Sequence, residues 1–167
     1  MEDIKIVDYE EKYAEEIDKI ESIEWQTDGI VNVLDENSIA LVAKKEEEVI
    51  GTIYGNEVGD LFILDVLIIK KEYQNKGIGT ALMTEMFNKI KNKNIKNILA
   101  KVVFSNNHMN AEGLIKKFNF KETLRIKGYW GSKYPDISCK VCNCMPCECT
   151  CVFYIKEIND LIENKER

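Results

Sequence analysis

A glycine-containing turn over residues 74–80 separates two segments of different periodicity. The segment before it, residues 60–70, is rich in β-branched and apolar residues, which predicts a buried strand. After it, apolar residues recur on one face of a helix that we expect to end near residue 93: Ile78, Leu82, Met83, Met86, Phe87 and Ile90. Gly77 and Gly79 allow positive φ angles and a close approach to the main chain, so the first unpaired N–H groups of the helix can converge on an anion. The turn is therefore predicted to bind phosphate groups.

The spacing of the glycines separates three kinds of phosphate-binding loop. A dinucleotide-binding fold needs G-x-G-x-x-G near the chain start, whereas Leu82 occupies the third glycine position here. A P-loop needs G-x-x-x-x-G-K followed by Ser or Thr, and no such string occurs. The pattern that remains, Q-x-x-G-x-G after a strand, resembles the coenzyme A pyrophosphate loop of the GNAT superfamily of N-acetyltransferases. A second block, residues 106–120, lies about where that family carries an asparagine, a short helix and a Gly-Phe ending, and the resemblance extends over residues 4–157.

Residue patterns and the resemblance together predict an α/β (α+β) fold with a mixed, mainly antiparallel seven-stranded sheet flanked by helices. The chain of 167 residues, 45% of them hydrophobic, suits a single domain over residues 1–167 with a sizeable core. Strands are expected at residues 4–7, 38–43, 49–55, 61–69, 98–104, 120–126 and 152–157. Helices are expected at residues 10–23, 78–93 and 110–118, with a further short helix within residues 24–37.

The resemblance implies that acetyl-CoA is the cosubstrate and lies between the fourth and fifth strands, which splay apart in that family. By position, the main chain of Leu67, Ile68 and Ile69 would pair with the pantetheine arm, and an N–H near Ile68 would polarise the thioester carbonyl. The pyrophosphate would be held by Gln74, Asn75, Lys76, Gly77, Ile78, Gly79 and Thr80. The family's asparagine at the start of the second block aligns with His108 without a gap, or with Asn107, as a cofactor-binding residue, if one residue is inserted.

The resemblance also implies direct attack of a primary amine on the acetyl carbon in a ternary complex, without a covalent enzyme intermediate. Asp65 is the candidate base or amine anchor, and a purely structural hydrogen-bonding role is the alternative. The family's usual general acid, a tyrosine, aligns with Ile115, so the proton donor is unassigned. Tyr54, Tyr129 and Tyr154 could substitute, although a core or rim packing role is the commoner one for each.

Several other residues are candidates for the rim of the site. Trp25 and Trp130 could wall an acceptor pocket, but packing is the commoner role of a large aromatic residue. His108, the only histidine, is expected at the start of a helix and facing solvent, with a catalytic or ligand role as the alternative. Asn119 stands where the family has the glycine of Gly-Phe, and asparagine tolerates the left-handed backbone.

Charge and hydropathy restrict the partners and the compartment. A net charge of −6 disfavours general nucleic-acid binding, which relies on a positive field, and suits an amine acceptor. Three lysines lie near the turn: Lys70, Lys71 and Lys76. Either an anionic cofactor or an ordinary solvated surface explains them. The chain shows no apolar run long enough for a bilayer and no signal peptide, so we expect a cytoplasmic protein without membrane partners, either monomer or homodimer.

All six cysteines fall within residues 139–151, between the last two expected strands, where the resembled family has a short hairpin. They are Cys139, Cys142, Cys144, Cys147, Cys149 and Cys151. Their dense spacing allows thiolates from one loop to surround one centre, and a reducing compartment disfavours disulfides. Zinc is the first choice of metal; copper(I), an iron–sulfur cluster, a metallothionein-like cluster and free or oxidised thiols are the alternatives.

Two functions are consistent with this sequence. The first is an acetyl-CoA-dependent N-acetyltransferase with a small-molecule or protein amine as acceptor and with the cysteine loop as a structural staple or lid. The second is a metal-binding or metal-responsive module on an acyltransferase scaffold that is weak in catalysis, which the missing tyrosine and the cysteine loop suggest. The phosphate-binding turn favours the first, because a metal sensor needs no such turn.

Overall fold

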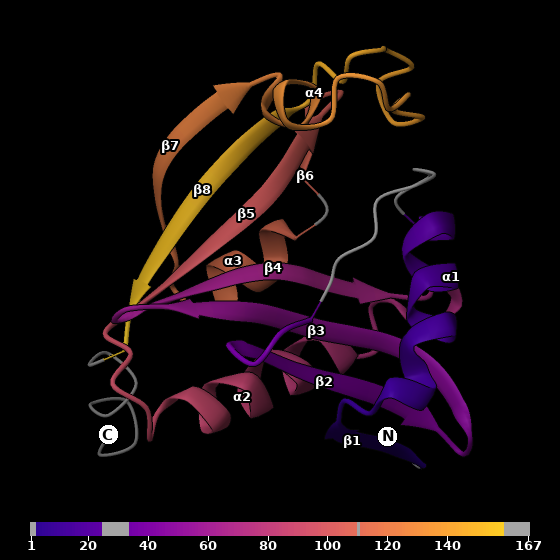
Figure 1. The fold of residues 1–167 in the computed structure, drawn as a ribbon, viewed down its shortest axis with the longest axis vertical. Helices are drawn as coiled ribbons and strands as arrows, with labels where there is room; N and C mark the ends of the chain where they lie inside the picture. The colour runs from indigo at the N-terminus through magenta and orange to yellow at the C-terminus, as the bar shows by residue number, and fades with distance from the viewer. Residues whose placement is uncertain (1–2, 25–33, 110, 159–167) are drawn as a thin grey trace.

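The computed structural model describes residues 3–24, 34–109 and 111–158 (Figure 1). One sheet has the strand order β1-β2-β3-β4-β5-β8-β7, and the short strand β6 pairs with β5. The strands are β1 (Ile4–Asp8), β2 (Ser38–Lys45), β3 (Glu48–Val58), β4 (Leu61–Ile69), β5 (Asn97–Ser105), β6 (His108–Met109), β7 (Lys121–Lys127) and β8 (Thr150–Glu157). The helices are α1 (Ala14–Glu24), α2 (Ile78–Ile90), α3 (Glu112–Lys117) and α4 (Tyr129–Lys133), with 3-10 turns at Glu11–Tyr13 and Lys71–Tyr73.

The sheet is antiparallel except between β4 and β5, and these two strands separate after a short stretch of pairing. Leu61 to Leu64 of β4 lie beside Asn97 to Ala100 of β5, and the paired register ends there. Beyond that point, β4 continues with β3 while β5 continues with β8, so the two halves of the sheet diverge (Figure 1). Within the described residues, the second half of β4 therefore has a strand partner on one side only.

A β-bulge lies at the point of divergence. Tyr54 of β3 pairs with Val66, and the next residue, Gly55, pairs with Leu64, so Asp65 is the extra residue of β4. Because one extra residue reverses the alternation of side chains, Leu64 and Val66 are buried on opposite faces of the sheet. The bulge thus bends β4 where it leaves β5.

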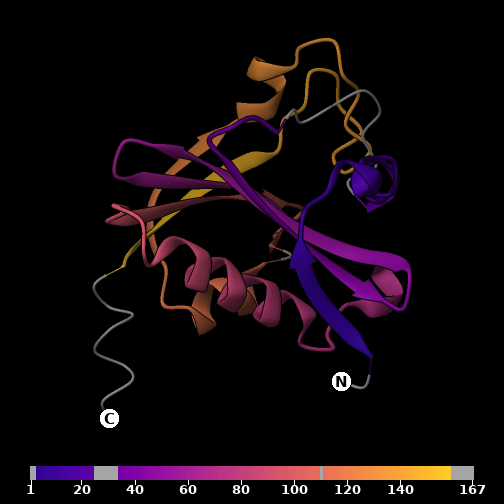
Figure 2. The ribbon, with the colours of Figure 1, turned by 60° about the horizontal axis from the view of Figure 1, so that its bottom comes forward.

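Helices cover both faces of the sheet (Figure 2). The apolar face of α2, together with α3, packs on one face in the larger core cluster. On the other face, Tyr13 of the 3-10 turn and Ile17 and Ile20 of α1 pack on Val42 and Val49. Period-two alternation along β2 supplies both cores, since Leu41 and Ala43 face α2 while Val42 faces α1.

The predicted fold class is confirmed, and three details differ. The sheet has an eighth strand, β6, of two residues, so His108 lies in a strand rather than at a helix start, although it is exposed as expected. The short helix α4 was not predicted, and α2 ends at Ile90. Most of the helix expected within residues 24–37 lies outside the described residues, and residues 34–37 do not form a helix. No helix among the described residues is long and apolar enough to cross a membrane.

Gly55 is the glycine on which the bulge region depends most directly. A Cβ added at Gly55 would lie 2.2 Å from the carbonyl oxygen of Ile63 and 2.8 Å from the buried ring of Phe62. We expect Gly55→Ala to lower the free energy of unfolding by about 1–3 kcal/mol, because backbone and ring must shift. Gly113→Ala is the matched control: nothing lies within 4 Å of its added Cβ, so alanine in α3 should raise stability by about 0.5–1 kcal/mol. Urea denaturation measures both, and equal effects of the two substitutions would contradict the expected steric role of Gly55.

Candidate functional site

A cavity of about 280 Å³ opens where β4 and β5 diverge. The two strands supply its walls at Leu64 to Leu67 and at Ala100 to Val103. Met83 of α2 and Leu114 and Ile115 of α3 line one end. Residues of α4, of the segment after it and of the cysteine loop line the other end: Tyr129, Trp130, Lys133, Tyr134, Ile137, Cys139, Val141, Cys147 and Cys149. The cavity therefore extends from the diverging strands to the cysteine loop.

The turn before α2 has the backbone that an anion site requires. Gly77 precedes the helix with a φ of 82°, and Asn75 has a φ of 59°. The expectation of a positive φ at Gly79 is wrong, because Gly79 lies inside α2. Its missing side chain instead provides space: a Cβ would lie 3.3 Å from Ile69 Cδ1 and 3.6 Å from Leu67 Cδ2. The first N–H groups of α2 are therefore open to a ligand beside the end of β4.

The Gln74 side chain connects the turn to the end of β4 and to the end of α1. Its amide donates to the carbonyl oxygen of Ile69 at 2.8 Å and to the carboxylate of Glu24 at 3.4 Å. Glu24, which sequence reasoning missed, also accepts a hydrogen bond from the Lys71 N–H at 2.8 Å and lines the cavity. Of the lysines near the turn, Lys70 pairs with Glu48 at 2.7 Å, and Lys76 lies 5.3 Å from the centre of the Tyr73 ring.

Asp65, the bulged residue, lines the cavity next to the last paired residues of β4 and β5. Its carboxylate forms an ion pair with Lys101 of β5 and accepts a hydrogen bond from the Asn56 side chain at 2.8 Å. The Asp65 side chain is 21% exposed and that of Lys101 is 17% exposed, so the pair is largely shielded from solvent. Lys101 was not predicted as a site residue, although a lysine inside the apolar segment of residues 98–104 was a detectable signal.

The candidate tyrosines lie in three different places. The Tyr54 hydroxyl donates to Glu21 at 2.6 Å within the core on the α1 face. The Tyr154 hydroxyl lies 3.4 Å from Glu122, and burial together with that carboxylate raises the pKa of Tyr154. Tyr129 lines the cavity, and so does Tyr134, which the sequence did not indicate. Ile115 is buried at the position of the family's tyrosine.

Two other predicted residues lie away from the cavity or outside the described chain. Asn107 is exposed in the turn between β5 and β6, with a φ of 59°, and is not a lining residue of the cavity. The neighbouring Asn106 donates to the carbonyl oxygen of Val141 in the cysteine loop at 3.4 Å. Trp25 lies outside the described residues.

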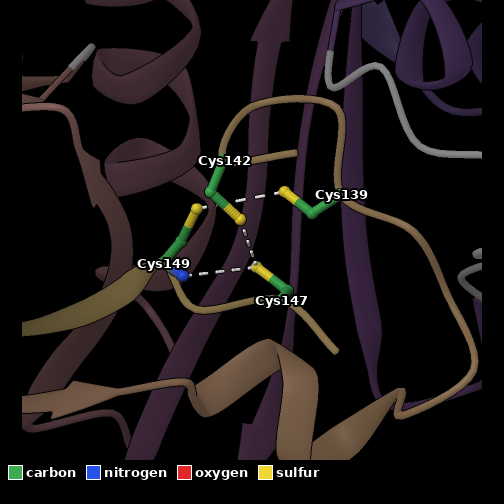
Figure 3. A group of neighbouring side chains, drawn as sticks. All are labelled: Cys139, Cys142, Cys147 and Cys149. Atoms are coloured by element: carbon green, nitrogen blue, oxygen red, sulfur yellow. Dashed lines mark hydrogen bonds between the residues drawn. The ribbon is translucent and has the colours of Figure 1, made fainter. Parts of the chain in front are cut away.

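The structure brings four of the six cysteines together (Figure 3). The Sγ atoms of Cys139, Cys142, Cys147 and Cys149 all lie within 4.8 Å of one another. Two opposite pairs are 3.9 Å apart, Cys139 with Cys149 and Cys142 with Cys147. A hydrogen bond from the Cys149 N–H reaches the Cys147 sulfur at 3.4 Å. The remaining two lie outside the group: the Cys144 thiol bonds to the Cys142 carbonyl oxygen, and Cys151 is buried within β8.

Burial and hydrogen bonds shift the pKa values of three of the four thiols in different directions. Burial raises the pKa of Cys149 to about 11 and raises the pKa of Cys147 further. Burial also acts to raise the pKa of Cys142, but hydrogen bonds from the main-chain N–H groups of Glu148 and Cys144 outweigh it and lower that pKa to about 6. One thiolate is thus stabilised by the main chain, while a soft cation would be needed to ionise its buried neighbours.

Helix α4 rests on the cysteine group. Trp130 packs against the buried cysteines, and Gly131 lies against the main chain of Cys147, where a Cβ would be 2.3 Å from the Cys147 oxygen. The Gly128 N–H donates to the Cys149 oxygen at 3.0 Å just before α4 begins. The cysteine loop thereby positions the α4 wall of the cavity.

Comparison with known proteins identifies the family. The sequence model of the acetyltransferase (GNAT) family matches residues 1–120, whereas comparison with curated proteins gives no match. Among solved structures, the ribosomal-protein-S18-alanine N-acetyltransferase of Escherichia coli is 15% identical, with a TM-score of 0.71 over 93% of this chain and 94% of that one. NAA60 of Arabidopsis thaliana, in complex with a bisubstrate analogue, is 14% identical, with a TM-score of 0.72 over 92% and 98%. A GNAT family acetyltransferase from Elizabethkingia anophelis with acetyl-CoA bound is 18% identical, with a TM-score of 0.66 over 94% and 99%.

The family match covers well over half of the chain and includes the turn, the helix α2 and the diverging strands. The fold of the solved GNAT structures extends over nearly all of it. The chain therefore belongs to the GNAT family of acetyltransferases.

Proposed function

We propose that this protein is an acetyl-CoA-dependent N-acetyltransferase that transfers the acetyl group to a primary amine by direct attack in a ternary complex. The observation that carries the proposal is the one-sided pairing of β4 beyond Leu64, directly beside the open N-terminus of α2. A cavity begins at this point and contains a carboxylate, Asp65. Cofactor arm, pyrophosphate and acceptor amine each have a matching surface there.

The residues at the cavity fit acetyl-CoA as the cosubstrate. Main-chain groups of Leu67, Ile68 and Ile69 would take up the pantetheine arm, because β4 beyond Leu64 has no described strand partner on the side away from β3. Gly77, Ile78, Gly79 and Thr80 would present N–H groups to the pyrophosphate, while Gln74, Asn75 and Lys76 shape the turn. Acetyl-CoA supplies a thioester whose carbon–sulfur bond breaks as the amine nitrogen bonds to the acetyl carbon. Asn107 does not line this cavity, so if it binds the cofactor as proposed, it does so outside the cavity.

The acceptor would enter from the end of the cavity lined by α4. Asp65 has accepting capacity left after its bonds to Lys101 and Asn56, so it would hold the amine or take its proton. Because Lys101 already compensates its charge, anchoring is the role that the geometry favours. Tyr129 and Tyr134 line the cavity, and the hydroxyl group of one of them would protonate the leaving thiolate.

Known relatives support a broad choice of acceptor. The E. coli relative is named for an alanine of ribosomal protein S18, and another solved structure is an aminoglycoside 6'-N-acetyltransferase that is 11% identical, with a TM-score of 0.71 over 92% of this chain. We therefore propose a small-molecule or protein amine as the acceptor. We also propose that the protein acts in the cytoplasm and has no nucleic-acid partner. A screen of amines for thiol release from acetyl-CoA tests the function, and a complete lack of amine-dependent release would contradict it.

The cysteine loop, residues 139–151, is proposed to bind a thiophilic metal, with zinc as the first choice. A metal-responsive module with weak catalysis is the second candidate function. It is favoured by Ile115 at the position of the family's tyrosine and by the charge compensation of Asp65. Metal binding without coenzyme A binding would select this second function.

Gly79→Val tests the cofactor site. Its branched side chain would fill the space beside Ile69 and Leu67, so calorimetry should detect no binding of acetyl-CoA to the folded variant. Gly113→Val is the matched control, because it is also a helical glycine and its added Cβ has open space. Unchanged affinity in the Gly79 variant would move the cofactor site elsewhere.

Asp65→Asn tests the acceptor site, because it keeps the shape of the side chain and removes its charge. The kcat with an amine from the screen should fall by at least ~10-fold, as expected for lost acid–base or anchoring assistance. Asp60→Asn is the control: Asp60 also pairs with a lysine, Lys96 at 2.9 Å, but lies in the β3–β4 hairpin away from the cavity. A parental rate and pH profile in the Asp65 variant would assign Asp65 to structure alone.

Metal binding is tested by elemental analysis of protein purified without oxygen. We expect stoichiometric zinc and masking of most of the six thiols against a thiol reagent until a chelator is added. Substoichiometric metal, with all six thiols freely reactive under reducing conditions, would refute the proposal.

A further inference from the structure

The four grouped cysteines have the geometry of a single-ion site. In a tetrahedral thiolate site with metal–sulfur bonds of about 2.3 Å, neighbouring sulfurs are about 3.8 Å apart. Two of the sulfur–sulfur distances here are 3.9 Å, and all of them are 4.8 Å or less, so an ion requires only small inward movements. The ligand pattern becomes C-x2-C-x4-C-x-C, with Cys144 and Cys151 excluded.

The loop around this site has few other means of holding its shape. Its central part, residues 140–146, is mostly exposed, and the main-chain contact that closes it is the bridge between Cys139 and Cys144. Three of the four grouped cysteines are buried, and together with Trp130 they form a small apolar cluster separate from the two main cores. A metal ion bonded to four side chains would therefore be the strongest constraint on the loop.

Helix α4 depends on that loop. A helix of five residues is not stable by itself, so α4 needs its tertiary contacts. Those contacts include the packing of Trp130 on the cysteines and the close approach of Gly131 to the Cys147 main chain. The same helix presents Tyr129, Trp130 and Lys133 to the cavity, whereas the phosphate-binding turn is built from β4 and α2.

We propose that one metal ion, held by Cys139, Cys142, Cys147 and Cys149, fastens α4 as the acceptor wall of the cavity, so that metal occupancy controls acceptor binding and leaves cofactor binding intact. The effect on acceptor binding rests on the proposed acetyltransferase function, whereas the metal site and its hold on α4 do not. Conformational order is the link: without the ion, acceptor binding must also order the wall, which weakens it.

The ligand set is tested with zinc as the probe. Cys149→Ser and Cys142→Ser should both lose stoichiometric zinc, whereas Cys144→Ser, in the same loop, should retain it. The Cys142 variant guards against misfolding, since Cys142 is the most exposed of the four. Loss of zinc from Cys144→Ser, or retention in both ligand variants, would overturn the assignment.

The effect of the metal on α4 is tested on the unmutated protein, by removing zinc with a chelator under reducing conditions and then restoring it. Hydrogen exchange of residues 128–134 should rise on removal and recover on restoration, while exchange of residues 78–90 and the Kd for coenzyme A stay constant. With an amine from the screen, KM for the amine should rise ~10-fold or more in the zinc-free protein. Unchanged exchange at residues 128–134 would overturn the inference even if zinc binds.

The proposed function fails separately from this inference. If no amine is acetylated, the acetyltransferase proposal is contradicted, while zinc content and exchange at α4 still decide whether the ion holds the wall. If exchange at α4 does not respond to zinc but acetylation proceeds, the fastener alone is wrong.

Discussion

The bulge at Asp65 is the local feature on which the rest of the site depends. One extra residue in β4 bends the strand and ends its pairing with β5 after Leu64. Main-chain groups beyond the bulge then face a cavity instead of a neighbouring strand, and such groups need hydrogen-bond partners. The same extra residue places a carboxylate at the mouth of the opening, with Lys101 opposite. The opening between β4 and β5 and the position of the Asp65 carboxylate thus follow from one backbone irregularity.

Local patterns predicted the elements of the fold well and the contacts between them poorly. The strand, turn and helix around Gly77 were readable because hydrophobic periodicity and a glycine with a positive φ are local properties. Lys101 and Glu24 were missed, because their roles come from strands and helices that meet only in the folded chain. The short elements β6 and α4 were also missed, since two to five residues carry too little periodicity to detect.

The cysteine loop shows the same limit in another form. Spacing alone pointed to a metal but could not choose among six thiols, because every sulfur in so dense a segment can reach a common centre. The folded structure separates two of them from the group: Cys151 belongs to β8, and the Cys144 thiol donates to the Cys142 carbonyl oxygen. The four that remain lie against α4, which gives the cysteine loop a place in the wall of the cavity.

Coenzyme A is proposed to bind along the open side of β4 and at the N-terminus of α2. Amide chemical shifts in nuclear magnetic resonance spectra test it most directly, because they report each main-chain group separately. Adding coenzyme A should perturb the amides of Leu67, Ile68 and Ile69 and those of residues 77–80 most strongly. Perturbations confined to the α1 face, or none at saturating coenzyme A, would contradict the account.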